Sequence, residues 1–287
     1  MDKAVYVDKI NILLSGTTTY RPTTRDPTRS LMLQFNSLLR NLLETSQINH
    51  PTYLNLISYN SLAPRLYGLP KIHKHGNPLR PIISNINAPS YKLSKFLLPA
   101  LQILSHNNSY DIRNSFHLKE LLQSFNIPDN FILTSFDDES LFTNIPIDKA
   151  LHIVEKNWTI IQPHTTLNLT SFLSALELCC NSGYLTFQDK FYHQINGLAM
   201  GKCLAPDISN IVLNDLLDSI IPLFSQDIIF IKKYVEDLFL VLNPDRIPEI
   251  LSAFNSYHPR LRFTVEGEID HSLPFLDYQK FPWLPIH

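Results

Sequence analysis

Glycine is scarce in this sequence, and its few cysteines form no familiar metal-binding or redox pattern. Only 7 of the 287 residues are glycine, against 20 prolines, so the loops are stiffened by proline. The three cysteines, Cys179, Cys180 and Cys203, include no C-x-x-C pair. We interpret them as ordinary buried thiols of a protein in a reducing compartment, which argues against a structural zinc site.

Long apolar runs and repeats are also missing. Every apolar run is broken by charge well before the length that a membrane span requires, and residues 1–5 lack the charged-then-apolar order of a signal peptide. The sequence contains no repeated or low-complexity segment. It therefore predicts a folded intracellular protein, nuclear or cytoplasmic, without membrane association. With 287 residues it is long enough for one large domain or two moderate ones.

Acidic residues are absent from Thr45 to Tyr110. This stretch carries six basic residues, which are Arg65, Lys71, Lys74, Arg80, Lys92 and Lys95. After Tyr110 the balance reverses, with 12 lysines and arginines against 22 aspartates and glutamates. Such asymmetry favours a protein that grips phosphates with one part and holds divalent cations with another. The alternative is that solvated faces happen to sort by sign.

The pattern of apolar residues predicts an α+β fold in which a mixed sheet is flanked by helices. We expect helices at residues 31–43, 89–104, 146–158, 170–181 and 207–223. We expect strands or hairpins at residues 131–136, 184–195, 227–242, 261–265 and 273–276. Four prolines interrupt residues 64–81, so residues 66–84 are expected to form a loop or a hairpin that carries basic side chains.

Carboxylates follow two of these predicted strands. The run from Phe131 to Phe136 stops at Asp137, Asp138 and Glu139, and the hairpin within residues 227–242 has Glu236 and Asp237 near its tip. Clustered carboxylates tolerate full ionisation only beside a cation, and hard oxygen ligands select Mg²⁺ or Mn²⁺. Two such ions, about 3.5–4 Å apart, assist in-line phosphoryl transfer. The alternative is that these residues are solvated caps of strands and turns.

Five motifs resemble, in order, those of Penelope-like reverse transcriptases. Residues 69–74 and 78–82 resemble the fingers motifs, and residues 135–146, from Ser-Phe-Asp to Asn-Ile-Pro, resemble the first palm motif. The Gly-Leu-Ala-Met-Gly of residues 197–201 resembles the second palm motif. Residues 234–239 stand where the family has its paired-aspartate hairpin, and residues 273–277 resemble a later strand. The resemblance implies a right-hand polymerase with fingers at residues 1–130, palm at 131–287 and a missing or incomplete thumb.

The resemblance also implies roles for individual residues. It makes Asp137, Glu236 and Asp237 the catalytic residues and the ligands of two Mg²⁺ or Mn²⁺ ions. It implies nucleotide-binding roles for four residues, which are Lys71 and Arg80 at the phosphates, Phe142 against the sugar 2′ position, and Gly201 where the backbone approaches nucleotide and template. The implied partners are an RNA template, a DNA primer and deoxynucleoside triphosphates, and protein partners stay unknown. Without the resemblance these four residues are surface charges, a core phenylalanine and a loop glycine.

Several positions depart from the family pattern. Glu236 replaces the first aspartate of the hairpin and extends its carboxylate by one methylene, and a displacement of about 1 Å at a catalytic position can lower the rate on the order of a hundredfold. Asp138 and Glu139 replace apolar residues and are expected to add negative charge beside the metals. Lys202 and Cys203 replace small residues and proline. The chain also lacks an upstream basic fingers motif and a full thumb or GIY-YIG nuclease domain, so we expect a fragment.

Three functions remain open on the sequence. The leading one is an RNA-directed DNA polymerase core. The second is an inactive polymerase-like module that binds nucleic acid through Lys71, Lys74 and Arg80, and the third is a two-metal nuclease, which gives no role to Phe142. We interpret His73 and His75 as exposed polar residues, because no carboxylate or cysteine lies near them in the sequence.

Overall fold

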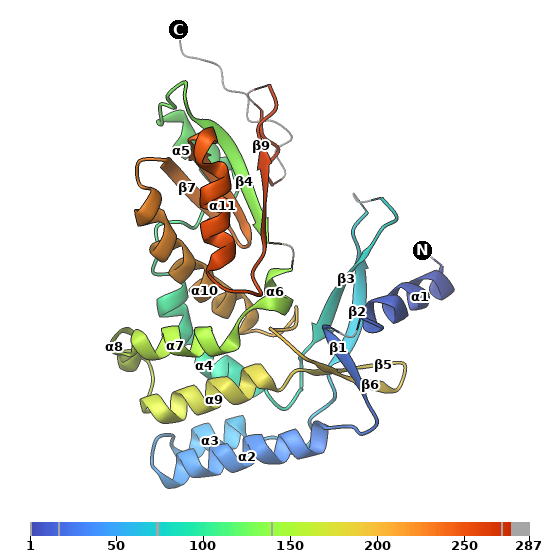
Figure 1. Cartoon of the computed structure of the whole chain (residues 1–287). Helices are drawn as coiled ribbons and strands as arrows, with labels where there is room; N and C mark the ends of the chain where they lie inside the picture. The colour runs from blue at the N-terminus through green and yellow to red at the C-terminus, as the bar shows by residue number, and fades with distance from the viewer. Residues whose placement is uncertain (1, 17, 73–74, 139, 271, 277–287) are drawn as a thin grey trace. The chain divides into compact units, whose positions relative to one another are not determined.

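A computed structural model describes residues 2–16, 18–72, 75–138, 140–270 and 272–276 of the chain. The chain folds into two compact units, each assembled from two stretches of sequence (Figure 1). The first unit comprises residues 1–104 and 142–209, and the second comprises residues 105–141 and 210–287. The boundary predicted after residue 130 separates fingers from palm, which are functional regions, whereas the two units are defined by contacts within the fold. That boundary stays a prediction.

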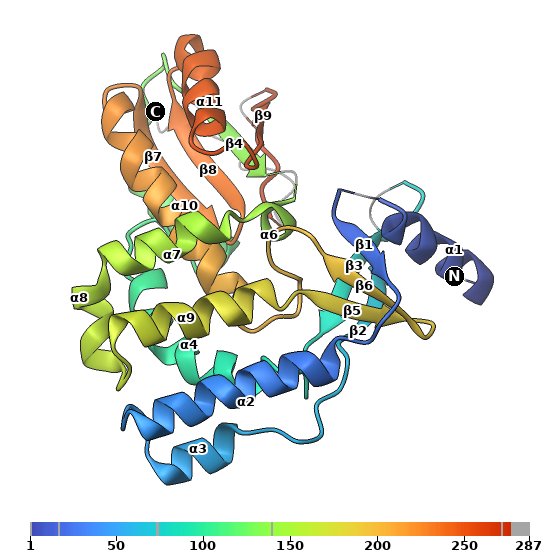
Figure 2. The same ribbon diagram turned by 60° about the horizontal axis from the view of Figure 1, so that its bottom comes forward.

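The first unit combines a five-stranded sheet with a group of helices (Figure 2). Its strands are β1 (Tyr20–Thr23), β2 (Arg65–Pro70), β3 (Leu79–Ser84), β5 (Tyr184–Phe187) and β6 (Lys190–Gln194). They lie in the order β1-β6-β5-β2-β3, antiparallel except for the parallel pair β2 and β5. The helices that lie wholly or mainly in this unit are α1 (Lys3–Leu14), α2 (Thr28–Glu44), α3 (His50–Leu56), α4 (Tyr91–Ser105), α6 (Leu141–Asn144), α7 (Ile147–Lys156), α8 (Trp158–Ile161) and α9 (Leu169–Asn181), followed along the chain from α8 by the 3-10 turn Gln162–His164.

Local sequence explains several ends of these elements. Asparagine caps two of the helices, because Asn49 accepts a hydrogen bond from the backbone N–H of Thr52 in α3, and Asn168 does the same for Ser171 in α9. The β5–β6 hairpin turns through Gln188 and Asp189, which both have positive φ (48° and 60°) as a tight two-residue hairpin turn requires.

The second unit is built on a four-stranded antiparallel sheet. Its strands are β4 (Ile132–Asp138), β7 (Ile228–Tyr234), β8 (Asp237–Leu242) and β9 (Phe263–Gly267), in the order β7-β8-β4-β9. The helices are α5 (Ser115–Gln123), most of α10 (Ala205–Ile220) and α11 (Ile247–Ser256), with 3-10 turns at Ile221–Phe224 and Pro244–Arg246. Strand β7 thus lies at one edge of the sheet and β9 at the other.

The core of the second unit covers both faces of this sheet, since side chains alternate between faces along a strand. On one face the ring of Phe136 in β4 packs against Phe254 of α11, with ring centroids 5.1 Å apart. On the other face Leu133 of β4 belongs to an apolar cluster with Phe239 of β8 and Leu118 of α5. The end of β4 that carries Asp137 and Asp138 therefore emerges from a rigid, well-packed sheet.

The predicted α+β class is confirmed, as are the five expected helices and the hairpins at residues 66–84, 184–195 and 227–242, with shifts of a few residues at their ends. The predicted strand at residues 273–276 is wrong. Leu273 and Phe275 are buried in the apolar cluster instead, and Leu276 has a positive φ of 54°, which breaks an extended run. Within the described ranges, no helix combines the length and hydrophobicity that a bilayer span requires.

Candidate active site

The end of β4 lies beside the start of β8. In the antiparallel ladder between these strands, Phe136 pairs with Leu238. The next residue outward along each strand is a carboxylate, Asp137 on β4 and Asp237 on β8. On its other side Asp137 pairs with Thr264 of β9, and its side chain is exposed. Two carboxylates that are 100 residues apart in the sequence thus reach the same end of one sheet.

A strained two-residue turn joins β7 to β8. Tyr234 pairs with Asp237, so the turn consists of Val235 and Glu236 alone. Val235 has a φ of 56°, a conformation that a β-branched residue rarely adopts. Such strain costs on the order of 1–3 kcal/mol and persists only where the surrounding structure holds it in place. The turn fixes the position of Glu236 directly after the strained residue.

Electrostatics couple the three predicted catalytic carboxylates. The pKa of Asp237 is raised from 3.8 to about 6, first by burial and then by the negative charges of Glu236 and Asp137. This shift requires all three side chains to lie within electrostatic reach of one another at the end of the sheet. The structure therefore brings together Asp137, Glu236 and Asp237, as the sequence predicts, within the second unit.

The chemistry of these side chains fits a divalent cation. Carboxylate oxygens are hard ligands that Mg²⁺ and Mn²⁺ prefer, and a cation would relieve the repulsion that raises the pKa of Asp237. Among the residues that the structure describes, no group of three histidine, cysteine, aspartate or glutamate side chains is arranged so that it could hold a metal ion.

Asp138 differs from the sequence expectation, which placed its charge beside the metals. Its side chain is buried on the opposite face of β4 from Asp137. There its carboxylate accepts hydrogen bonds from the backbone N–H groups of Ser140 (3.0 Å) and Arg262 (3.2 Å). Asp138 therefore ties the end of β4 to the start of β9. Glu139, predicted to act alongside it, lies outside the described residues.

Lys71 and Arg80 lie on the β2–β3 hairpin of the first unit. Leu69 pairs with Arg80, and the backbone N–H of Lys71 donates to the carbonyl oxygen of Pro78. Arg80 is exposed, and this pairing puts it on the same face of the hairpin as Lys71 and the exposed Leu69. The hairpin thus presents two cationic side chains together on one face. Lys74 and His73 lie outside the described residues, and His75 is exposed as predicted.

The loop from Gly197 to Gly201 is held between two segments of the first unit, and both of its glycines are required. Gly197 has a φ of 61°, and a Cβ there would lie 2.4 Å from the carbonyl oxygen of Phe142. Gly201 has a φ of 109°, and a Cβ would lie 2.4 Å from the carbonyl oxygen of Ile83 in β3. Hydrogen bonds from the N–H of Leu198 to the Phe142 oxygen (2.6 Å) and from Ile83 to the Met200 oxygen (2.7 Å) fix both contacts.

This loop links three of the predicted nucleotide-binding residues. Gly201 contacts β3, the strand that carries Arg80, and the other end of the loop contacts Phe142. The side chain of Phe142 is partly exposed rather than a fully buried core residue. Close backbone packing, which only glycine permits at these two positions, therefore sets the spacing between β3 and the short helix α6 that carries Phe142.

Lys202 has a structural partner that the sequence did not reveal. The side chain is buried, and its Nζ donates hydrogen bonds to the carbonyl oxygens of Cys179 (2.9 Å) and Cys180 (3.1 Å) at the end of α9. Burial lowers the pKa of this ammonium group. Lys202 thus caps a helix C-terminus, a favoured place for a cation. Cys179 and Cys180 are buried as predicted, and Cys203 is partly buried.

Sequence reasoning missed Lys233, a residue of β7 that is fully buried. Its ammonium group contacts the carboxylate of Asp111 and the side-chain oxygen of Asn210. The signal available in the sequence was the pair of lysines at residues 232 and 233 inside an otherwise apolar β-rich run. One of two adjacent strand residues must face the interior, so that interior lysine requires a partner.

The model of the reverse transcriptase (RNA-dependent DNA polymerase) family matches residues 72–266 of this chain. No curated protein sequence matches it. Among solved structures, a telomerase from Candida albicans in complex with the TWJ fragment of telomeric RNA is similar, with 12% identity and a TM-score of 0.56. The match covers 93% of this chain and 53% of the telomerase chain.

Viral polymerases are similar as well. The RNA-dependent RNA polymerase of BmCPV at its elongation state has 12% identity and a TM-score of 0.52, over 92% of this chain and 25% of the viral one. An RNA polymerase complex inside a dsRNA virus has 10% identity and a TM-score of 0.55, over 94% and 25%. At such identities the likeness shows the fold alone, which is that of polymerase fingers and palm. The chain spans about half of the telomerase chain and about a quarter of the viral chains.

Proposed function

Because this chain belongs to the reverse transcriptase (RNA-dependent DNA polymerase) family, we propose that it is the core of an RNA-directed DNA polymerase. In this proposal the chain adds deoxynucleotides to the 3′-hydroxyl of a DNA primer on an RNA template. One observation carries the proposal beyond the family match: the β4–β8 ladder puts Asp137 and Asp237 side by side at the end of a sheet, and Glu236 directly precedes Asp237 in the two-residue turn. Mutually repelling carboxylates at one point are the arrangement that a divalent cation stabilises.

We assign the binding of two Mg²⁺ or Mn²⁺ ions to Asp137, Glu236 and Asp237. Bound there, the ions would supply the charge that orients the attacking and leaving oxygens of an in-line phosphoryl transfer. The rigid β4–β8 pairing supports this role, because it holds Asp137 and Asp237 on neighbouring strands without a flexible loop between them and the core.

In this proposal the β2–β3 hairpin binds the triphosphate of the incoming nucleotide. Arg80 offers a fork of N–H donors that suits two phosphate oxygens, and Lys71 offers a point charge on the same face. Phe142 is proposed to exclude a ribose 2′-hydroxyl, and Gly201 to allow close approach of the backbone. In functional terms we propose fingers at residues 1–130 and palm at residues 131–287.

The finer identity is proposed from the ordered motifs. Their sequence, including Lys71 in the fingers and Gly197 to Gly201 in the palm, supports a Penelope-like retroelement reverse transcriptase, a transposable-element product that acts inside the cell, in nucleus or cytoplasm. The glutamate at residue 236 is the departure that bears on activity, since a carboxylate displaced by about 1 Å can lower a rate on the order of a hundredfold.

Primer extension by the purified protein tests the proposal. An RNA template annealed to a DNA primer is incubated with deoxynucleotides and either Mg²⁺ or Mn²⁺. We expect slow extension by the natural chain and extension on the order of 10- to 100-fold faster by the Glu236→Asp variant, because aspartate restores the shorter carboxylate. Asp237→Asn in the same background should abolish extension.

The basic β2–β3 hairpin favours a second function, which is that of an inactive polymerase-like module that binds nucleic acid. If neither the natural chain nor Glu236→Asp extends a primer, this function explains the protein better. That module would bind RNA–DNA hybrids with an affinity that falls steeply with salt, and an Arg80→Ala variant would bind more weakly with a shallower salt dependence. Cleavage of the hybrid without extension would instead favour a nuclease.

A further inference from the structure

The fully buried lysine of β7 lies three residues before Glu236. Lys233 donates a hydrogen bond from Nζ to Oδ1 of Asp111 and another to Oδ1 of Asn210. These partners come from two other segments of the second unit, the loop after α4 and the helix α10. A single ammonium group therefore connects the strand that leads into the Glu236 turn with two elements that are distant in sequence.

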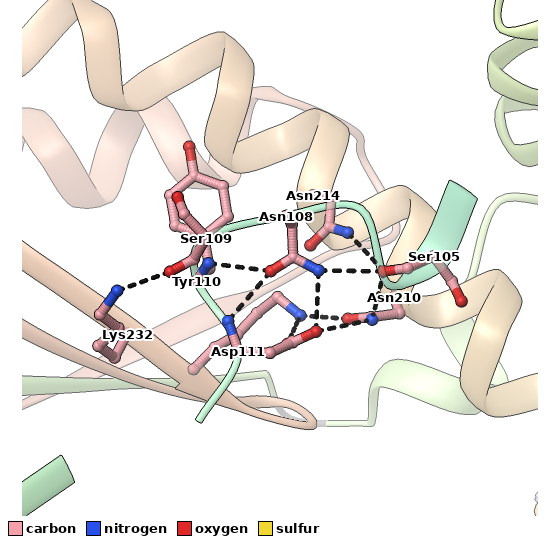
Figure 3. A network of polar contacts seen from close by, with 9 residues as sticks. Ser105, Asn108, Ser109, Tyr110, Asp111, Asn210, Asn214 and Lys232 are labelled. Atoms are coloured by element: carbon pink, nitrogen blue, oxygen red, sulfur yellow. Dashed lines mark hydrogen bonds and ion pairs between the residues drawn. The ribbon is translucent and has the colours of Figure 1, made fainter. Parts of the chain in front are cut away.

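Asparagines complete this network (Figure 3). The side-chain N–H groups of Asn108, Asn210 and Asn214 all donate to the carbonyl oxygen of Ser105, at 3.0, 2.8 and 3.0 Å. The remaining carboxylate oxygen of Asp111 accepts from Asn108 (2.8 Å) and Asn210 (3.2 Å). Because both oxygens of Asp111 are bonded, its carboxylate is held in one orientation toward Lys233.

The backbone of Lys233 is held by the same loop. Its N–H donates to the carbonyl oxygen of Tyr110 (2.8 Å), and its carbonyl oxygen accepts from the N–H of Ile112 (2.9 Å). Strand β7 lies at the edge of the sheet, so these two bonds occupy main-chain groups that β8 does not reach. Residues 110–112 thus brace the edge of β7 next to the turn.

Burying an ammonium group costs free energy, because the charged group loses its hydration. Burial lowers the pKa of Lys233, and the hydrogen bond and charge of Asp111 offset part of that effect. An apolar side chain of similar length would avoid this desolvation penalty. A buried ion pair is therefore weak evidence that the pair stabilises the fold, and a better explanation is that the pair specifies one conformation. The feature here that needs such specification is the strained turn at Val235.

We propose that Lys233 is a positioning residue, which with Asp111 and Asn210 holds the end of β7 so that Glu236 and Asp237 stay in the geometry required for nucleotidyl transfer. This inference rests on the proposed function. In this proposal Lys233 does not contact the substrate. Lys233 affects the positions of Glu236 and Asp237 only through strand β7 and the turn that follows it.

The test separates positioning from stability. Lys233→Met alone leaves Asp111 without its cation, which destabilises the fold. The informative protein is therefore the double variant Lys233→Met with Asp111→Asn, which removes both charges and should recover the unfolding temperature. The matched control is Lys232→Met. Lys232 is the adjacent residue of β7 and donates to the carbonyl oxygen of Ser109 in the same loop (2.6 Å; Figure 3). Because side chains alternate along a strand, it lies on the opposite face of β7 from Lys233.

Two measurements are made on each protein, in the Glu236→Asp background so that turnover is high enough to resolve. We expect the double variant to lose roughly 10- to 100-fold in kcat with KM for the deoxynucleotide changed less than about threefold. We also expect hydrogen exchange at the backbone amides of residues 234–237 to become at least about tenfold faster. Lys232→Met should leave both quantities unchanged.

A stable double variant with the kcat and exchange rates of its parent would overturn the proposal, since the ion pair would then serve the fold only. Failure of the proposed function looks different, because no variant, including Glu236→Asp itself, would then add nucleotides. In that case the hydrogen-exchange measurement by itself tests whether Lys233 positions the turn. Faster exchange confined to residues 234–237 supports positioning of the turn by Lys233, and unchanged exchange refutes it.

Discussion

Replacing Asp237 by asparagine should stabilise the metal-free protein above pH 6. The pKa of Asp237 is raised from 3.8 to about 6 by burial and by the charges of Glu236 and Asp137, so ionising this group costs more free energy in the folded state than in the unfolded chain. Two pKa units correspond to roughly 3 kcal/mol, and because Asp237 keeps partial contact with solvent we expect about 2 kcal/mol. Asparagine keeps the shape of the side chain and removes the charge.

The direction of the pH dependence follows from the raised pKa. The protonated group favours the folded state, and that contribution is fully present below pH 3.8 and is lost as pH rises through about 6. The stability difference between Asp237→Asn and the natural chain should therefore be near zero at pH 4 and complete at pH 8. For a chain of this size, about 2 kcal/mol corresponds to a rise of roughly 4 °C in unfolding temperature.

Scanning calorimetry in metal-free buffer between pH 4 and pH 8 measures this difference. Addition of Mn²⁺ at pH 8 should raise the unfolding temperature of the natural chain and should have little effect on Asp237→Asn, because the cation offsets the repulsion that the variant already lacks. Asp129→Asn, which removes one exposed carboxylate from the same unit, is the control for net charge. Equal unfolding temperatures at pH 8, or a gap that widens toward pH 4, would refute the reasoning.

Three further changes have defined outcomes. Gly197→Ala should destabilise by on the order of 3 kcal/mol or more in chemical denaturation, because its Cβ would meet backbone at 2.4 Å, whereas Gly76→Ala, with a similar φ of 75° and open space around it, should cost about 1 kcal/mol. Lys202→Met should cost about 2–4 kcal/mol in the same assay by leaving two helix-end carbonyl groups unpaired, and a neutral result would contradict the capping role. Phe142→Ala should increase incorporation of ribonucleotides relative to deoxynucleotides in primer extension, and an unchanged ratio would remove its proposed role.

The sequence predicted the local elements well because their determinants are short-range. The two apolar β-prone runs of the hairpin at residues 227–242 and the acidic residues at its tip are adjacent in the chain, and their positions hold in the structure. The three-and-four spacing in α2 likewise marks a buried face at Phe35, Leu39 and Leu42. The strand predicted at residues 273–276 failed, because an apolar run of four residues fits a buried loop as well as a strand.

Longer-range features were beyond reach of the sequence. Asp137 and Asp138 are neighbours with the same side chain, yet one is exposed beside Asp237 and the other is buried against backbone N–H groups. Lys202 stands out in the sequence only as a departure from the family pattern, yet in the structure it caps α9. Arg262 lies 124 residues from Asp138, and Cys179 lies 23 residues from Lys202, so no local pattern identifies these partners.

The sequence by itself determined that this chain has β-prone segments ending in carboxylates, a basic hairpin interrupted by proline, and an α+β fold, since propensity, periodicity and turn chemistry act between near neighbours. Only the tertiary structure decided which carboxylates share one end of a sheet and which cation each buried charge meets. Strand register and the alternation of faces make those choices, and a buried charge such as Lys233 is tolerable only when the folded chain brings Asp111 to it from 122 residues away.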